Sequence, residues 1–516
     1  MNAFFRNKPG TKSGAAKPTV RKETILVPVK STSKTGLTAR SSSSTPSTPQ
    51  TPPAKRSAQS ATTKPKDSKE KTLQRPAQRA IANARGVKRK SATPQPEGPL
   101  FSDSENDDDG SSDIGASDSD VSRKRMKSSV SSLESIGPRR DIVLKETDKS
   151  PLHLVHSADL TSGPYESKYQ NPWDNNEEVT VKLQYPSRSS RERFQLKWPK
   201  QGSDEYKPFD DMKETIKHVV MFYFPEALRE KYLDDSSGFE RRFHRAWIKQ
   251  SVQDWVDTAQ EYNTVVRKLV EDGSIQQELS KMHTLDLELV KRILDQIYSR
   301  TVSLSVEKLK VYKFGTDNVY GELLPRFVRE IFDKVRLKHE HVFVDLGSGV
   351  GNVVLQAALD IGCESWGIEM MKTPCELAEL QANEFAARTR LWGLSTGKVK
   401  LLQGDFTESP KIAEVLKRAD LVLVNNQAFT SDLNEKLTAM FLDLKDGARV
   451  VSLKPFVPDG HRISARNIGS PINQFVQVRF EWYPDYVSWG GNGGHYYIAT
   501  KDPRPLEAFM RKHNIR

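Results

Sequence analysis

The stretch HVFVDLGSGVGNVVLQAALDIG, residues 341–362, decides how the second half of the chain is interpreted. A β-rich apolar run precedes glycines at Gly347, Gly349 and Gly351, and a helical apolar pattern follows them, which is typical of a strand, a tight turn and a helix. Turns of this kind hold nucleotide-type cofactors in parallel α/β sheets. The stretch therefore predicts a cofactor site and leaves open which cofactor it binds.

The turn departs from two common nucleotide-binding patterns. Asn352 stands where a dinucleotide fingerprint has its third glycine, which weakens an interpretation as an NAD site. No Lys-Ser/Thr pair follows the glycines, so a P-loop is excluded. Asp345, two residues before the first glycine, instead favours a cofactor with a positive charge, such as the ammonium and sulfonium of S-adenosyl-L-methionine.

Acidic residues also follow the next two predicted strands. Glu369 closes SWGIE, 24 positions after Asp345, where one carboxylate can accept hydrogen bonds from both ribose hydroxyls. Asp405 and Phe406 follow the third strand, with a carboxylate for the adenine amino group and a ring to cover the base. Because ligands bind at the carboxyl ends of strands in such sheets, the three positions together favour S-adenosyl-L-methionine over NAD.

Short β-rich runs alternate with helical stretches after residue 300. The expected strands lie within 341–347, 365–370, 399–405, 419–426 and 448–455, and then within 475–484 and 495–501. The first five predict a parallel sheet with right-handed crossovers, and the last two predict an antiparallel hairpin at one end of it. The predicted fold class is α/β, with a mostly parallel, seven-stranded sheet of the class I S-adenosylmethionine-dependent methyltransferase type.

The rest of the chain divides into three further parts. Residues 205–310 show helical apolar spacing and predict a helical lobe of three or four elements before a methyltransferase domain at 311–510. Residues 151–204 are expected to form a partly ordered connector. Residues 1–150 are rich in Ser, Thr, Pro, Lys and Arg, and they predict a disordered tail because they cannot bury enough apolar surface to offset chain entropy.

The basic charge of the chain is concentrated in that tail. Residues 1–100 carry 21 Lys and Arg against 4 Asp and Glu, whereas the remaining 416 residues carry 58 against 63. Such a tail predicts contacts with nucleic acid, and the Lys/Arg clusters at 86–92 and 122–128 are typical of nuclear import signals or nucleic-acid contacts. The acidic block at 102–120 is interpreted as a hydrated spacer in preference to a mimic of a polyanion.

Several classes of protein are not indicated. Cys363 and Cys375 stand without a CxxC or Cys/His cluster, so we expect neither a disulfide framework nor a metal site, and a reducing compartment fits best. The N-terminus has no apolar core of a secretion signal, and no run approaches the roughly 18 apolar residues that a membrane helix needs. We therefore expect a soluble protein without a membrane partner.

Seven short segments, in order, resemble one known family. They are KFGTDNVYGELLP (313–325), FVDLGSGVGN (343–352), GIE (367–369), GDF (404–406), VNNQAF (424–429), VVSLKPF (450–456) and VSWGGNGGHYYI (487–498). Together they are similar to the disruptor-of-telomeric-silencing family, non-SET histone methyltransferases that modify lysine 79 of histone H3 on the nucleosome. The match covers roughly residues 200–510, and the basic tail resembles that of fungal members.

The resemblance implies a histone-lysine N-methyltransferase of the nucleus that acts in chromatin silencing and the DNA damage response. Its implied partners are histone H3 and the other core histones of the nucleosome, nucleosomal DNA through the basic tail, and ubiquitin on a neighbouring histone. The implied cofactor contacts are Tyr320, Gly321, Glu322 and Leu323 at the methionine end, the turn Phe343, Val344, Asp345, Leu346, Gly347, Ser348, Gly349, Val350, Gly351 and Asn352, then Glu369 at the ribose and Asp405 and Phe406 at the adenine.

The resemblance also implies the catalytic residues. Asn425 would lie beside the transferring methyl group, while Phe429, Trp489 and Tyr496 would wall a narrow channel for the incoming lysine. Gln427 stands where some relatives carry a phenylalanine, which makes that side of the channel more polar.

Two alternatives stay open at this point. The first is a non-catalytic nucleosome-binding module that keeps the cofactor fold as a scaffold. The second is a methyltransferase for another protein or for nucleic acid. Action on DNA bases is disfavoured, because the fourth strand runs into VNNQAF and lacks both prolines of the Asn/Asp-Pro-Pro-aromatic motif.

Overall fold

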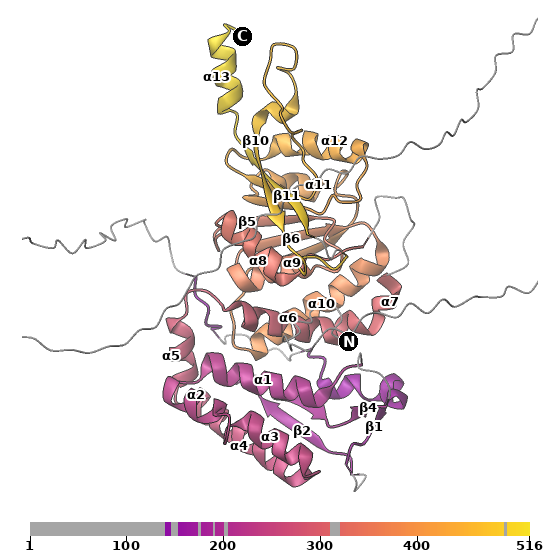
Figure 1. Cartoon of the computed structure of the whole chain (residues 1–516), viewed down its shortest axis with the longest axis vertical. Coiled ribbons are helices and arrows are strands. Elements are labelled where there is room, and N and C mark those ends of the chain that lie inside the picture. The colour runs from indigo at the N-terminus through magenta and orange to yellow at the C-terminus, as the bar shows by residue number, and fades with distance from the viewer. Residues whose placement is uncertain are drawn as a thin grey trace, which may run out of the picture. The chain divides into compact units, whose positions relative to one another are not determined.

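The computed structural model describes residues 140–145, 153–173, 177–188, 191–200, 205–309, 320–489 and 493–515. Its centre is a seven-stranded sheet in the order β10-β11-β9-β8-β5-β6-β7 (Figure 1). The strands are β5 (Val342–Leu346), β6 (Glu364–Glu369), β7 (Val399–Gln403), β8 (Leu421–Val424), β9 (Arg449–Ser452), β10 (Phe475–Trp482) and β11 (Gly494–Lys501). All seven coincide with the strands predicted from the sequence, and the predicted fold class is confirmed.

The topology places a ligand site at the carboxyl end of β5. Strands β5 to β9 pair in parallel, with β6 on one side of β5 and β8 on the other. The strand order therefore reverses direction at β5, which leaves a crevice beyond its carboxyl end. Strand β11 pairs antiparallel with β9 and β10, so the last two strands form the predicted hairpin at one edge.

Helices precede and follow these strands, and those that come before β11 in the chain pack against the sheet. They are α8 (Pro325–Lys334), α9 (Asn352–Gln356) with a π turn at Ala357–Ile361, α10 (Lys372–Leu391), α11 (Pro410–Leu416), α12 (Ser431–Met440) and, after β11, α13 (Arg504–Lys512). All five residues of β5 are buried, which explains its continuous apolar run. No helix in the described ranges has the length and apolarity to span a membrane.

The helical lobe contains more elements than the sequence predicted. Within the described residues 205–309 it consists of α1 (Pro208–Tyr223), α2 (Glu226–Leu233), α3 (Phe239–Ile248), α4 (Val252–Glu271), α5 (Ser274–Lys281), α6 (Leu287–Thr301) and α7 (Val306–Leu309). The prediction of three or four elements was wrong because two long periodic stretches each contain a break. Residues 224–225 separate α1 from α2, and residues 249–251 separate α3 from α4.

Residues 153–200 form strands that the sequence did not reveal. Strand β1 (Tyr169–Gln170) pairs with β4 (Trp198–Pro199), and β2 (Thr180–Gln184) pairs with β3 (Arg191–Gln195), both antiparallel. Leu183, Tyr185 and Phe194 from this segment are fully buried. The segment predicted as a partly ordered connector therefore supplies part of the core. Residues 140–145 were predicted to belong to the disordered tail, but Ile142 is buried in the same core and Val143 forms a bridge with Leu394. The rest of the predicted tail lies outside the described residues.

The lobe and the sheet share one hydrophobic core. The cluster that contains Phe194 and the buried faces of α1, α4 and α6 also contains Leu355, Phe385 and Trp392 from the helices of the methyltransferase part. Helices α6 and α10 pack side by side at this boundary (Figure 1). Because apolar burial is the main stabilising contribution to folding, we expect the two parts to fold as one unit.

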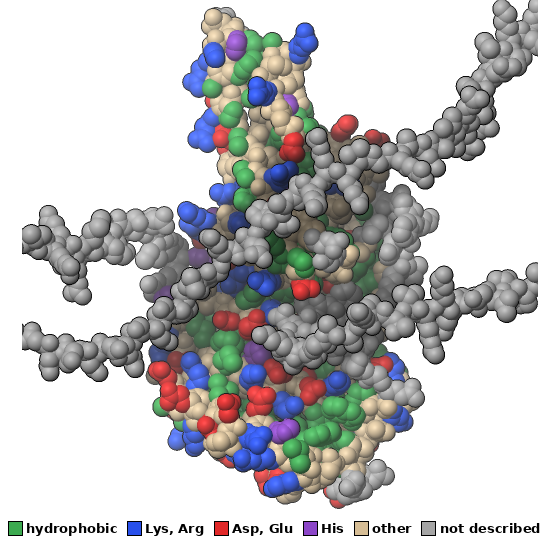
Figure 2. All heavy atoms as spheres, viewed as in Figure 1, with side chains coloured by type: hydrophobic (Ala, Val, Ile, Leu, Met, Phe, Trp, Pro, Cys, Tyr) green, Lys and Arg blue, Asp and Glu red, His purple; other side chains and the backbone are tan. Residues whose placement is uncertain are grey.

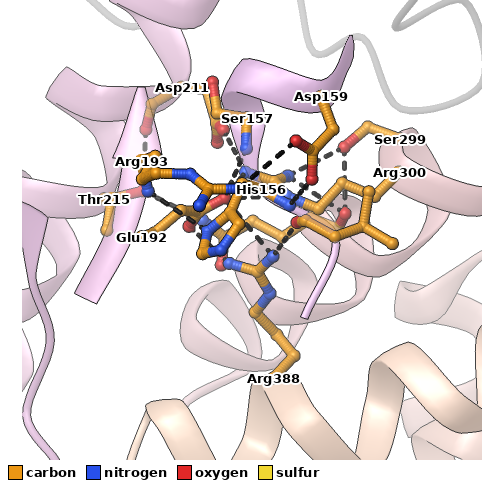
Figure 3. A network of polar contacts seen from close by, with 12 residues as sticks. His156, Ser157, Asp159, Glu192, Arg193, Asp211, Thr215, Ser299, Arg300 and Arg388 are labelled. Atoms are coloured by element: carbon orange, nitrogen blue, oxygen red, sulfur yellow. Dashed lines mark hydrogen bonds and ion pairs between the residues drawn. The ribbon is translucent and has the colours of Figure 1, made fainter. Parts of the chain in front are cut away.

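A buried ion-pair network joins the same elements (Figure 3). Glu192 of β3 accepts hydrogen bonds from Arg300 of α6 at 2.7 Å and from Arg388 of α10 at 2.5 Å, and all three side chains are buried. Arg300 also donates to Asp211 of α1 at 2.5 Å. Burial alone would raise the pKa of Glu192, but the two guanidinium groups hold it below its ordinary value.

Candidate active site

A cavity of about 520 Å³ opens at the carboxyl ends of β5, β6 and β8. It is lined by Tyr320, Gly321, Glu322, Leu323, Asp345, Gly347, Ser348, Gly349, Val350, Asn352, Val353, Glu369, Met370, Met371, Pro374, Asp405, Phe406, Leu423, Asn425, Phe429, Thr430 and Leu433. The volume lies in the range of small-molecule and cofactor sites. The structure thus brings together, from five separate segments, most of the residues that the sequence singled out.

The glycine turn forms the floor of the cavity. Gly347 has φ +87°, and its amide and that of Ser348 donate to the Ile368 carbonyl oxygen, both at 3.0 Å. A Cβ atom on Gly349, which has φ +55°, would lie 2.9 Å from the Tyr320 ring. The backbone therefore needs glycine here both for its left-handed conformation and for the close approach of the neighbouring loop.

Asp345 is a buried carboxylate at the end of β5. Its exposed fraction is 4%, and burial together with the neighbouring Glu369 carboxylate raises its pKa to about 8. A buried carboxylate without a cation is costly, so this position favours a positively charged ligand.

Glu322 is a second buried carboxylate, in the loop before α8. The hydroxyls of Tyr298 and Tyr320 both donate to its Oε1 atom, whereas Oε2 is buried and makes no hydrogen bond within the described residues. Burial raises the pKa of Glu322, and the hydrogen bonds from Tyr320 and Tyr298 partly oppose this effect. The unpaired Oε2 atom is an acceptor for a cationic group in the cavity.

Glu369 and Asp405 keep acceptor capacity toward the cavity. Glu369 accepts from the backbone amides of Gly349 at 3.0 Å and Met371 at 2.8 Å, one on each oxygen. Asp405 uses Oδ1 for the amide and hydroxyl of Thr407, at 2.7 and 2.8 Å. These bonds orient both carboxylates, and each retains lone pairs for further donors.

Two consecutive asparagines at the end of β8 have different environments. The Asn425 amide donates to the Gly321 carbonyl oxygen at 3.2 Å and lines the cavity. Asn426 is fully buried and accepts from the amides of Leu453 and Lys454, at 2.9 and 2.8 Å. Of the two asparagines, Asn425 therefore lines the cavity and Asn426 does not.

The predicted lysine-channel residues do not all meet at the cavity. Phe429 lines it and stacks on Phe406, with the ring centroids 6.2 Å apart. Trp489 is 40% exposed and packs on Gly321, where a Cβ atom would lie 2.5 Å from its ring. Trp489 therefore covers the loop beside the cavity without lining it.

Tyr496 lies in the core, outside the cofactor cavity, and its role in the wall of a lysine channel stays a prediction. Its side chain is fully buried against Phe327 and Phe480, and its hydroxyl contacts Glu330 at 3.2 Å. Gln427, the predicted polar departure, is exposed and does not line the cavity. Alternation along β11 gives the two faces of the strand but not which face points to the ligand.

Some predicted cofactor residues support the site from outside the cavity. Phe343, Val344 and Leu346 are core residues of β5, and Gly351 begins α9. The sequence also missed seven lining residues, which are Val353, Met370, Met371, Pro374, Leu423, Thr430 and Leu433. Met370 and Met371 directly follow the strand-end Glu369, and this adjacency is the signal that could have found them.

No group of three or more metal-binding side chains occurs among the described residues.

The strand order and the acidic cavity at the end of β5 define a class I S-adenosylmethionine-dependent methyltransferase. The family model described as "Histone methylation protein DOT1" matches residues 298–501. The chain is 49% identical over 405 residues to a "Histone-lysine N-methyltransferase, H3 lysine-79 specific" of Aspergillus fumigatus, covering 77% of this chain and 80% of the relative. The chain belongs to this DOT1 family, the one that its motifs resemble.

Other similar proteins carry the same name or share only part of the architecture. The Emericella nidulans protein of that name is 49% identical over 359 residues, which cover 69% of this chain and 72% of the relative. Among solved structures, an RNA methyltransferase from Salinibacter ruber in complex with S-adenosyl-L-homocysteine is 21% identical, has a TM-score of 0.23 and covers 35% of this chain and 94% of its own. A likeness at that TM-score decides nothing, so the fold assignment stands on the strand order.

Proposed function

We propose that this chain transfers a methyl group from S-adenosyl-L-methionine to the side-chain amine of lysine 79 of histone H3 in nucleosomes. Membership of the DOT1 family supports this activity, and the H3 lysine-79 specificity is that of relatives such as the Aspergillus fumigatus protein. The observation that carries the proposal is the cavity, in which buried Asp345 and the Oε2 atom of Glu322 have no cationic partner among the residues that the structure describes.

The residues in the cavity fit the cofactor in charge and in order. Asp345 and Glu322 would hold the positively charged methionine end, Glu369 the ribose hydroxyls, and Asp405 with Phe406 the adenine. The amides and glycines of residues 347–351 allow the close approach of the backbone. When bound, the cofactor supplies an electrophilic methyl group on a sulfonium.

The lysine must lose its proton before it can attack. A lysine amine has a reference pKa near 10.4 and is mostly protonated at neutral pH. Apolar walls such as Phe429 remove water and lower that pKa, and a nearby positive charge acts in the same direction. Attraction of the ammonium to aromatic faces opposes this by about 0.5 to 2 kcal/mol. Desolvation and repulsion together outweigh that attraction.

No lining residue is placed to serve as a dedicated base. The ionisable side chains that line the cavity are Tyr320, Glu322, Asp345, Glu369 and Asp405, all of which belong to the proposed cofactor contacts. The proton therefore leaves to solvent, and the rate comes mainly from positioning. Asn425 and its hydrogen bond to Gly321 would fix the geometry beside the methyl group.

The cellular setting is also part of the proposal. A histone methyltransferase acts on chromatin, so we place the protein in the nucleus, with roles in silencing and the DNA damage response. On the face shown in Figure 2, Lys and Arg side chains are interspersed with Asp and Glu over the helical lobe. We assign contacts with nucleosomal DNA to residues 1–100 because of their basic charge, and ubiquitin on a neighbouring histone is a further proposed partner.

A panel of methyl acceptors tests the function. The purified chain would be incubated with labelled S-adenosyl-L-methionine and nucleosomes, free histone H3, DNA or RNA. We expect incorporation into H3 on nucleosomes and none into DNA or RNA. Incorporation into nucleic acid alone would favour the second enzyme hypothesis, and cofactor binding without transfer to any acceptor would favour the non-catalytic module.

A further inference from the structure

Tyr298, from the helical lobe, contacts Glu322, which lines the cofactor cavity. It lies on the last turn of α6, is 6% exposed, and its hydroxyl donates to Glu322 Oε1 at 3.3 Å. Tyr320 donates to the same oxygen from the loop that carries Glu322. Two phenols from different parts of the fold therefore bind one oxygen of one carboxylate.

This arrangement fixes the direction of the other carboxylate oxygen. Because Oε1 is engaged by both hydroxyls, Oε2 remains the only oxygen of Glu322 with no hydrogen-bond partner among the described residues, and it is buried at the cavity. A buried acceptor in that state needs a donor, and a cationic donor suits a carboxylate best.

We propose that Tyr298 is a positioning residue, which aims the Glu322 carboxylate at the positively charged methionine end of the cofactor. The inference rests on the proposed function and adds to it a residue that no cofactor motif contains. The helical lobe would then contribute a residue to the cofactor-binding site.

The ion-pair network holds Tyr298 in place. Arg300, two residues further along α6, is fixed by Glu192 at 2.7 Å and by Asp211 at 2.5 Å (Figure 3). Rotation of the last turn of α6 would break buried ion pairs, which is strongly unfavourable. The hydroxyl of Tyr298 therefore meets Glu322 in a set position, which lowers the entropic cost of ligand binding.

The pairing also sets the protonation of Glu322. The groups that face this carboxyl are Tyr298 from α6, Tyr320 from the loop and Asn352 from the start of α9, and Asp345 and Glu369 are the other acids of the cavity. Burial raises the pKa of Glu322, and the phenols lower it. Removing one phenol therefore raises that pKa further, so that protonation of Glu322 on acidification begins at a higher pH.

The test compares Tyr298→Phe with the unmodified chain by calorimetric titration of S-adenosyl-L-methionine. The hydrogen bond from Tyr298 to the Glu322 carboxylate is long, at 3.3 Å, so we expect its loss to weaken binding at pH 7 only roughly fivefold. The loss should be larger at pH 6 than at pH 8.5, and KM for the cofactor should rise while kcat on nucleosomes stays within about twofold.

Tyr262→Phe is the matched control. Its hydroxyl is also buried in the lobe and donates to the Gln184 carbonyl oxygen at 3.1 Å, away from the cavity. This variant should bind the cofactor like the unmodified chain at every pH. A second test repeats Tyr298→Phe in a Glu322→Gln background, where the effect on binding should largely disappear.

The outcomes separate the two proposals. If the folded, unmodified chain does not bind S-adenosyl-L-methionine, the proposed function fails. If it binds and Tyr298→Phe behaves like Tyr262→Phe, the role of Tyr298 is overturned. An effect of Tyr298→Phe that persists in full beside Glu322→Gln would also overturn it, because Tyr298 would then act on the fold and not through Glu322.

Discussion

The buried Asp345 carboxylate lies at the carboxyl end of β5, beside Glu369 at the end of the adjacent strand β6. Burial and the negative charge of Glu369 together raise the pKa of Asp345 to about 8. In the absence of a bound cation, Asp345 is therefore mostly neutral at pH 7. A ligand cation favours the ionised form, so binding is linked to loss of a proton.

This linkage predicts the pH dependence of cofactor binding. Below pH 8, part of the binding free energy is spent on ionising Asp345, so affinity should rise with pH until about pH 8 and then level off. Calorimetry at pH 7 in two buffers of different ionisation enthalpy should show release of close to one proton per cofactor bound. Asp345→Asn should bind weakly and release fewer protons. Equal proton release by both proteins would contradict the assignment.

The raised pKa of Asp345 also predicts how the stability of the unliganded protein depends on pH. An aspartate has a pKa near 3.9 in the unfolded chain, so between about pH 4 and pH 8 the folded state binds more protons than the unfolded state. The stability that results is fully present below pH 4 and is lost as pH rises to about 8. Thermal melting should show Asp345→Asn gaining Tm relative to the unmodified chain as pH rises. A pH-independent difference would refute the raised pKa.

The two asparagines after β8 should separate catalysis from stability. The substitution Asn425→Ala removes the side-chain amide that lines the cavity. It should abolish methyl transfer to nucleosomes and leave Tm unchanged. The Asn426 side chain accepts hydrogen bonds from two backbone amides and donates to Asn434 and to the Lys454 carbonyl oxygen. The substitution Asn426→Ala removes all of these bonds and should therefore destabilise the fold by about 2 to 4 kcal/mol. Steady-state kinetics and melting of both proteins decide this, and normal turnover by Asn425→Ala would remove its assigned role.

The segment 153–200 should be required for folding of the catalytic part. A fragment that begins at residue 205 retains Arg300 and Arg388 but loses Glu192, which leaves two buried guanidinium groups without this carboxylate. Loss of one partner of a buried ion pair costs about 3 to 5 kcal/mol. We expect a fragment from residue 140 to melt cooperatively and a fragment from 205 to be insoluble or unfolded. Equal melting temperatures would contradict this.

The basic tail predicts a salt-dependent contribution to nucleosome binding. Deletion of residues 1–100 removes a net charge of +17 and should weaken binding and flatten its dependence on salt. A tail of equal length with its Lys and Arg replaced by Ser is the control for length. If affinity and salt slope stay unchanged, the tail serves as a spacer or an import signal.

The sequence predicted the sheet well because β-rich runs, glycine turns and strand-end acids are local signals. Asp345, Glu369, Asp405 and Asn425 could be placed at one edge because parallel strands share their carboxyl ends. Side-chain direction on the edge hairpin depends on packing against α8, so the sequence could not show that Tyr496 is buried against Phe327.

The contributions from distant segments had no local signal. Tyr298 lies in an ordinary amphipathic helix, and only the folded chain brings it to Glu322, 24 positions away. Glu192 looks like one charged residue in a polar segment, and its burial depends on arginines 108 and 196 positions away. Such long-range pairs require the three-dimensional structure.

Mass spectrometry of nucleosomes after incubation with the purified chain and S-adenosyl-L-methionine tests the central claim most directly. The account predicts that histone H3 gains the mass of methyl groups at lysine 79, that Gly347→Arg abolishes this gain, and that nucleosomes with arginine in place of that lysine stay unmodified. A folded, cofactor-saturated chain that leaves lysine 79 unmodified would contradict the account.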